Sequence, residues 1–108
     1  MIRKGTTPIH IFKLPFPTSE LSAAKATYRQ GEKIILEKRL EDAVLNESAI
    51  AWKLTQGETF KFLDSKPVEI QLRVLTFEDK AHSTKIITES VYRSLDEEIL
   101  QPVYKEDE

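Results

Sequence analysis

Apolar and polar residues alternate along much of this chain, and alternation with a period of two predicts β-strands. The clearest case is PVEIQLRVLT, residues 67–76, where Val68, Ile70, Leu72 and Val74 alternate with Glu69, Gln71 and Arg73. Such a strand buries one face and leaves the other in water. The turn EDKAHS follows, and TKIITESVYRSL is predicted to be the returning strand of a hairpin.

The first predicted strand lies in PIHIFKLPF, residues 8–16, and both of its faces carry apolar residues. One parity is His10, Phe12, Leu14 and Phe16, and the other is Ile9, Ile11 and Lys13. Proline has no N–H to give to a sheet, and prolines stand at positions 8, 15 and 17. We therefore expect an edge strand that ends near Pro15.

Residues 21–40 predict a strand, a turn at QGEK and a second strand. The second strand places Ile34, Leu36 and Leu40 on one face, with Lys38 as an exception. Because the segment is rich in alanine, a helix over residues 19–30 is the alternative.

The middle of the chain predicts a short strand in EDAVLNES and another in AIAWKLT. Ile50, Trp52 and Leu54 share a face of the latter, so Trp52 is expected to fill the core. Thr55 is placed to cap one helical turn in TQGETFKF.

Near the C-terminus, Ser94 and Glu97 have the spacing of a capping box, which predicts a short helical turn that Pro102 ends. In all, about seven short strands with turn signals every 8–12 residues or so are typical of a β-sandwich. The sequence thus predicts an all-β, immunoglobulin-like sandwich of antiparallel strands with that helical turn. Residues 1–100 form the single predicted domain, and residues 101–108 a charged tail.

Composition narrows the possible partners. The 108 residues carry a net charge of −2, which argues against the basic face that nucleic-acid binding needs. No stretch approaches the ~20 apolar residues of a membrane-spanning helix, so a membrane partner is not expected. Since the chain has no cysteine, a disulfide framework and a thiolate metal site are excluded.

Catalytic chemistry is not expected from the residues. Of the two histidines, His10 is predicted to be buried and hydrogen-bonded, and His82 to be exposed in a loop. Two distant histidines do not make a metal site, and the acidic pairs lie in predicted loops. Gly31 and Gly57 are expected in turns rather than in a phosphate-binding loop. We therefore predict no catalytic residue, no metal, no cofactor and no enzymatic activity.

Exposed apolar side chains are the remaining candidates for function. Ile9 and Ile11 lie on the second face of the edge strand, and Phe77 lies where the long hairpin begins. Contiguous apolar surface marks partner sites. We therefore predict that Ile9, Ile11 and Phe77 bind a partner protein.

Four segments together resemble a family of phage proteins: MIRKGTTPIHIFKLPF, LTQGETFKF, PVEIQLRVLT and SVYRSLDEEIL. Over residues 1–100 the chain resembles small virion-associated proteins of tailed bacteriophages and prophages of Gram-positive hosts. It is similar in style to the N-terminal β-sandwich of siphophage upper-baseplate proteins. It departs from that pattern at Ile9 and Ile11, where threonines are usual, and at Glu89, where an apolar residue is usual.

The resemblance implies a structural or assembly protein of the tail, baseplate or neck that acts through protein–protein contacts. Its expected partners are other phage structural proteins and further copies of itself, and its expected location is the host cytoplasm during synthesis and then the virion. One alternative is a carbohydrate-binding module, which needs an exposed aromatic residue such as Trp52 or Tyr92, although their strand parity points both inward. The other is a phage protein that is not packaged and binds a host protein.

Overall fold

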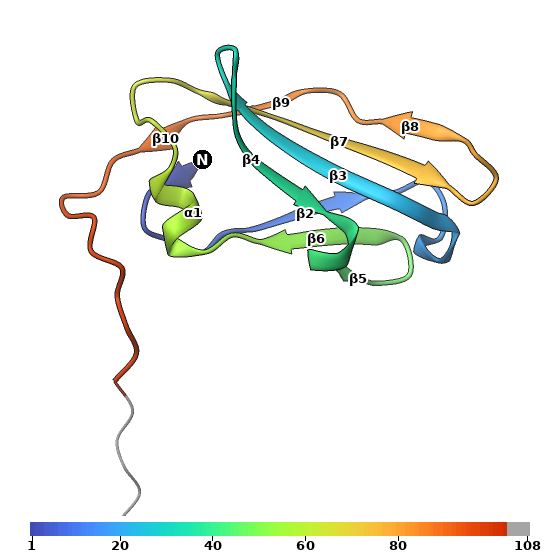
Figure 1. The fold of residues 1–108 in the computed structure, drawn as a ribbon, viewed down its shortest axis with the longest axis horizontal. Helices are drawn as coiled ribbons and strands as arrows, with labels where there is room; N and C mark the ends of the chain where they lie inside the picture. Colours follow the sequence, from blue (N-terminus) through green and yellow to red (C-terminus); the bar gives the residue numbers. More distant parts are fainter. Residues whose placement is uncertain (104–108) are drawn as a thin grey trace, which may run out of the picture.

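Two β-sheets face each other across a shared apolar core in the structure, a computed structural model that describes residues 1–103 (Figure 1). The five-stranded sheet comprises β4 (Lys33–Arg39), β3 (Leu21–Gln30), β7 (Val68–Thr76), β8 (Ala81–Ser83) and β9 (Ile87–Glu89), with β8 and β9 both paired to β7. The three-stranded sheet has the order β2 (Ile9–Lys13), β6 (Ala49–Lys53) and β5 (Val44–Leu45). All pairings within these two sheets are antiparallel, so the predicted all-β class is confirmed.

The alternation read from the sequence determines which side chains enter the core. On β7, Val68, Ile70, Leu72 and Val74 are buried as predicted. On β6, Ile50 and Trp52 are buried, and the Trp52 Nε1–H donates to the Arg39 carbonyl at 2.9 Å. Trp52 therefore fills the core between the sheets, and its polar group has a partner.

Residues 21–30 form strand β3, so the helical alternative over 19–30 is wrong apart from one 3-10 turn, η1 (Thr18–Glu20). The β3–β4 turn uses Gly31 at φ +61°, a left-handed conformation that glycine adopts readily. A β-bulge follows, since Tyr28 pairs with Leu36 but Arg29 pairs with Ile34. The extra residue reverses the parity of the strand end, and Ile34 is exposed rather than buried as predicted.

Helix α1 (Gln56–Phe60) is the helical turn predicted after Thr55. The Thr55 hydroxyl accepts from the Glu58 N–H at 3.1 Å, and the Glu58 carboxylate accepts from the Thr55 N–H at 2.8 Å, which completes a capping box. The same carboxylate pairs with Lys38 at 2.6 Å, which explains the polar exception on the inner face of β4. Gly57 had been predicted to lie in a turn, but it lies inside this helix.

Two short strands were not predicted as a pair: β1 (Ile2–Arg3) and β10 (Val91–Tyr92) form a parallel two-stranded ladder. Its residues are far apart in sequence, and parallel pairing carries no local turn signal. The predicted returning strand, residues 84–95, is divided into β9 and β10, and β8 lies in the segment predicted to be the turn. The structure has ten strands within residues 1–103 where about seven were predicted. Tyr92 points outward and is 47% exposed, which corrects its predicted inward parity.

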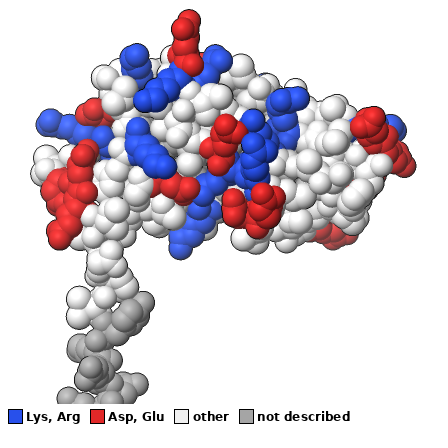
Figure 2. Space-filling model, in the orientation of Figure 1, with Lys and Arg blue, Asp and Glu red and all other residues white. Residues whose placement is uncertain are grey.

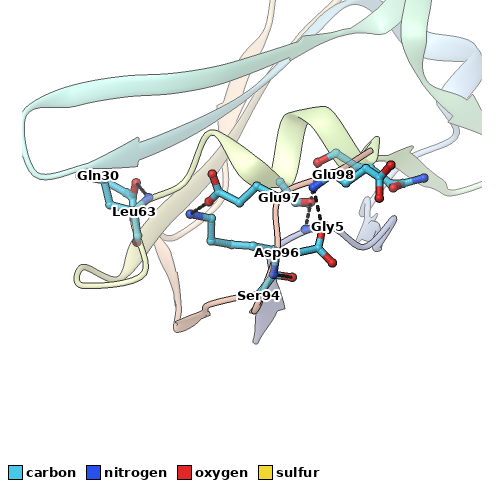
Figure 3. A network of polar contacts seen from close by, with 10 residues as sticks. Gly5, Gln30, Leu63, Ser94, Asp96, Glu97 and Glu98 are labelled. Carbon is cyan, nitrogen blue, oxygen red and sulfur yellow. Dashed lines mark hydrogen bonds and ion pairs between the residues drawn. The ribbon is translucent and has the colours of Figure 1, made fainter. Parts of the chain in front are cut away.

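The predicted C-terminal helical turn is absent, and residues 93–103 have no helix or strand. Side chains there accept hydrogen bonds from backbone N–H groups. The Asp96 carboxylate accepts from the Glu98 N–H at 2.7 Å, and Ser94 Oγ accepts from the Asp96 N–H at 3.4 Å (Figure 3). Glu97 pairs with Lys4 at 3.1 Å instead of closing a capping box. Of the predicted tail, residues 104–108 lie outside the described part of the chain.

A second 3-10 turn, η2 (Leu40–Asp42), connects β4 of one sheet to β5 of the other. With η1 on the β2–β3 connection and α1 on the β6–β7 connection, it is one of three short helical segments that carry the chain between the sheets (Figure 1). No helix in residues 1–103 is long and apolar enough to cross a membrane.

Candidate interaction surface

The outer face of the three-stranded sheet carries a row of exposed aliphatic side chains. Ile11 pairs with Ala51 and Ala51 pairs with Val44, so these residues lie side by side across β2, β6 and β5. Ile9 lies next to Ile11 along the same face of β2. Ile9 is 60% exposed, Ile11 64% and Val44 70%. We call this row, Ile9, Ile11, Ala51 and Val44, the outer apolar strip.

The strip is bordered by positive charge. Lys53 pairs with Ile9, and Lys13 pairs with Ala49 at the other end of β2. Both lysines are exposed on β-strand ends. An apolar row with cations at its two ends suits a protein partner rather than a cleft for a small substrate.

Strand β2 also presents an open edge. The Pro8 carbonyl accepts from the Leu54 N–H at 2.9 Å, and the Leu14 N–H donates to the Ser48 carbonyl at 2.8 Å. These bonds show that even-numbered residues direct their backbone groups toward β6. Because the direction alternates along a strand, Ile9, Ile11 and Lys13 direct their N–H and C=O groups away from the sheet. Within residues 1–103, no hydrogen bond involves those groups.

The three residues predicted to bind a partner are all exposed, but the structure brings only two of them together. Ile9 and Ile11 share the outer apolar strip, whereas Phe77 begins the β7–β8 turn of the other sheet. Phe77 is 75% exposed, and its N–H donates to the Glu20 carbonyl at 3.0 Å. Phe77 thus lies apart from the strip.

Val44 and Ala51 belong to the strip but were not singled out from the sequence. Their own segments gave no signal of a shared surface, since EDAVLNES predicts a short strand but does not indicate which of its side chains are exposed. The signal lies in the pairing of β5 with β6, which joins two short segments across a turn at residues 46–48. Only a register assignment could have placed Val44 beside Ile11.

Polar groups inside the fold are paired with one another. His10 Nδ1 lies 2.6 Å from the Tyr28 hydroxyl, and the two rings stack with centroids 5.5 Å apart. Burial lowers the pKa of His10, and the positive charge of the N-terminus acts in the same direction. Burial also raises the pKa of Tyr28, with the negative charge of Glu58 as a second cause. The pair is therefore neutral at pH 7. The hydrogen bond predicted for His10 is present, but His10 is half-buried rather than buried.

Glu58 is held in its charged form. Burial alone opposes ionisation, but the hydrogen bonds from Lys38 and from the Thr55 backbone outweigh it and lower the pKa of Glu58. Among the described residues, no buried side-chain nitrogen or oxygen lacks a hydrogen-bond partner. These polar groups thus stabilise the fold.

His82 is exposed, as predicted, but lies on strand β8 and not in a loop. Its ring packs against Phe16 with centroids 5.3 Å apart. Residues 1–103 contain no group of three His, Cys, Asp or Glu side chains placed to hold a metal ion.

A shallow hollow of about 230 Å³ lies on the outer face of the five-stranded sheet and is lined in part by Lys25, Arg39 and Arg73. Glu37 pairs with Lys25 at 2.9 Å and with Arg39 at 3.4 Å, so one carboxylate offsets part of the charge of these three cations. Figure 2 shows basic and acidic side chains interspersed over the viewed face, without a large field of one sign.

The aromatic residues that glycan stacking would need are occupied. Trp52 is 1% exposed. Tyr92 is 47% exposed, but the Arg3 guanidinium lies over its ring, 5.5 Å from the centroid. This contact is a cation–π pair that covers one face of the ring.

Comparison with protein-family models, with curated proteins and with solved structures finds no match for this chain.

Proposed function

We propose that this chain is a structural or assembly protein of a tailed-phage particle, at the tail, baseplate or neck, that acts through protein–protein contacts. We further propose that its two facing sheets form an immunoglobulin-like sandwich. Particle components assemble through repeated contacts between rigid domains, and exposed strand edges with apolar faces supply such contacts.

The observation that carries the proposal is the outer apolar strip beside the open edge of β2. Isolated exposed isoleucines are ordinary, but here Ile9, Ile11 and Val44 are contiguous and adjoin unpaired backbone groups. Four segments of the chain resemble virion-associated phage proteins, and this resemblance supports a phage particle as the place where the contact surface binds its partner. A partner in the virion would cover the strip and satisfy the open N–H and C=O groups.

The test is mass spectrometry of particles purified from the strain that encodes the chain. We expect the chain in fixed proportion to known tail components, with a copy ratio that reflects the symmetry of its ring. Clean absence from particles, with the chain abundant in the lysate, would reject the structural role and favour a protein that binds a host partner and is not packaged.

A matched pair of variants links incorporation to the strip. The double variant Ile9→Lys, Ile11→Lys should fold but be lost from particles, because two charges replace the apolar contact. The control is Ile34→Lys, which changes an isoleucine of similar exposure (50%) on the five-stranded sheet. Equal incorporation of both variants would show that the strip is not the contact surface.

The carbohydrate-binding alternative has less support, because Trp52 is buried and Arg3 covers one face of Tyr92. Phe77 is an exposed aromatic residue, but it stands alone at a turn tip, whereas glycan sites stack sugars on a built aromatic surface. Binding of cell-wall glycan that changes on Tyr92→Ala, with the strip variants unaffected, would favour that alternative.

A further inference from the structure

We propose that the open edge of β2 pairs with β2 of a second copy of this chain, in an antiparallel register centred on Ile11. This inference rests on the proposed function, since it names a partner for the same surface.

The other sheet edges in residues 1–103 are poorer templates for pairing. β1, β5 and β10 have two residues each, and β8 and β9 have three each, separated by residues 84–86. β4 is longer but presents Lys33, Glu37 and Arg39 as exposed charges. Short, interrupted and charged edges are the usual protection against pairing.

β2 lacks that protection. It has five residues, contains no proline, and exposes Ile9 and Ile11 on its outward face, with a charged residue only at its end. Its open groups belong to Ile9, Ile11 and Lys13, as the bonds of the even-numbered residues to β6 show.

The open groups also select the register. Two copies related by a two-fold axis pair residue i with residue j at a constant sum of numbers. Centring on Ile11 pairs Ile9 with Lys13 of the second copy and Ile11 with its equivalent, so every open residue of β2 finds a partner. Centring on Lys13 would place two lysines directly opposite, which is destabilising. Centring on Ile9 or on His10 would move the pairing outside the strand, to residue 7, and centring on Phe12 would move it to Pro15, which has no N–H.

This register keeps the two Lys13 side chains apart, although it brings Lys13 of each copy to two strand spacings, about 10 Å, from Lys53 of the other, because Lys53 pairs with Ile9. Salt screens the repulsion between these exposed lysines. The two Lys13 side chains are offset by four residues, or about 14 Å at about 3.4 Å per residue. That exceeds the Debye length of about 10 Å at 0.1 M salt. The two outer apolar strips then join across a continuous six-stranded sheet, with Ile11 beside Ile11 at its centre.

The shared edge is short, so the complex should be weak. Five residues at about 3.4 Å extend for about 17 Å, well below the length that a standard interface of about 1,600 Å² requires. We therefore expect a dimer that dissociates on dilution and that a particle would reinforce through its additional contacts.

Single-cysteine cross-linking tests the register directly, because the natural chain has no cysteine. In the proposed dimer the two Ile11 Cα atoms lie about 5.5 Å apart, as in any hydrogen-bonded antiparallel pair. The two Val44 residues lie five strand spacings apart, about 24 Å at about 4.8 Å each. A short bis-maleimide should therefore cross-link Ile11→Cys into covalent dimers and leave Val44→Cys monomeric. Equal cross-linking of these two similarly exposed positions would overturn the proposal.

Analytical ultracentrifugation of the purified chain over a wide concentration range provides the second test. Ile11→Pro removes an N–H that β6 does not use, so the fold should persist while dimerisation is lost. Ile11→Thr keeps the N–H and the β-branched shape, and should retain most of the dimer. Val44→Lys should leave edge pairing intact. It would abolish any association in which the outer apolar strips of two copies stack face to face. A wild-type chain that is monomeric at every concentration, or a dimer lost in Val44→Lys and kept in Ile11→Pro, contradicts edge pairing.

These measurements use the isolated protein and are independent of the particle experiment. Incorporation into particles without dimerisation in solution would reject the edge dimer alone. Dimerisation of a chain that is absent from particles would reject the proposed function alone.

Discussion

Gln30 offers the sharpest test of how this fold is held together. It is 3% exposed at the end of β3, and its amide makes three hydrogen bonds to the connection between α1 and β7 (Figure 3). Its Nε2 donates to the Leu63 carbonyl at 2.7 Å and to the Lys66 carbonyl at 2.8 Å. Its Oε1 accepts from the Leu63 N–H at 2.8 Å. One side chain thus replaces the strand pairing that this connection lacks.

Gln30→Leu keeps the approximate shape of the side chain and removes all three bonds. At about 0.5–1.5 kcal/mol for each net hydrogen bond, the free energy of unfolding should fall by about 1.5–4.5 kcal/mol. The control is Gln71→Leu on β7, where the amide donates one hydrogen bond, to the Thr84 carbonyl at 3.0 Å. That substitution should cost only about 0.5–1.5 kcal/mol.

Urea unfolding followed by tryptophan fluorescence measures both losses. Trp52 is the only tryptophan and is 1% exposed, so its emission reports the opening of the core. The midpoint should shift at constant m-value if only stability changes. If Gln30→Leu costs no more than Gln71→Leu, the three bonds are replaced by water and do not secure the connection.

Three further predictions concern the same end of the molecule. Gly5→Ala should lower the free energy of unfolding by about 2 kcal/mol or more, because Gly5 has φ +82° and an added Cβ would lie 2.8 Å from Phe60 Cζ. Urea unfolding measures this loss. An unchanged midpoint would contradict the prediction. Thr59→Val should cost about 1–3 kcal/mol in the same assay, because the buried hydroxyl accepts from the Gly5 N–H at 2.9 Å and donates to a backbone carbonyl; a neutral result would refute that role. Because the pKa of His10 is lowered in the folded state, its contribution to stability is complete above pH 6.5 and declines as the pH falls toward the folded pKa. The pKa of Glu58 is also lowered, so a second loss of stability follows below pH 4.5. Urea midpoints at pH 7.5, 5.5 and 3.5 should fall in two steps, and His10→Gln should remove the first; an unchanged midpoint between pH 7.5 and 5.5 in the natural chain would contradict the linkage.

Much of the fold could be predicted because residues close together in the sequence determine it. Alternation over residues 67–76 identifies the buried face of β7, and Thr55 as a helix cap identifies the start of α1. The exposure of Ile9 and Ile11 follows from the parity of one strand. In each case, neighbours in sequence decide the conformation.

What could not be predicted depends on distant partners. The β1–β10 ladder joins residues about ninety positions apart, and the bulge that turns Ile34 outward appears only in the pairing of β3 with β4. At the C-terminus, Asp96 competes with a helix by binding the Glu98 N–H, and Lys4 draws Glu97 away. The outer apolar strip belongs to the same class, because Val44 and Ile11 become neighbours only through β6.

The polar contacts at the α1 end bear on how β2 meets a partner. Thr59 on α1 accepts from the Gly5 N–H and donates to the Thr6 carbonyl at 3.0 Å, which fixes the chain just before β2 begins. The Pro8 carbonyl then accepts from the Leu54 N–H, so β2 is joined to β6 from its first residues. A strand that is already held straight loses little conformational entropy when a second strand pairs with it, and most of each new hydrogen bond is available for affinity. Thr59→Val should therefore weaken dimerisation in ultracentrifugation even in solutions where the chain remains folded. A dimer of unchanged affinity would show that the edge is ordered by β6 alone.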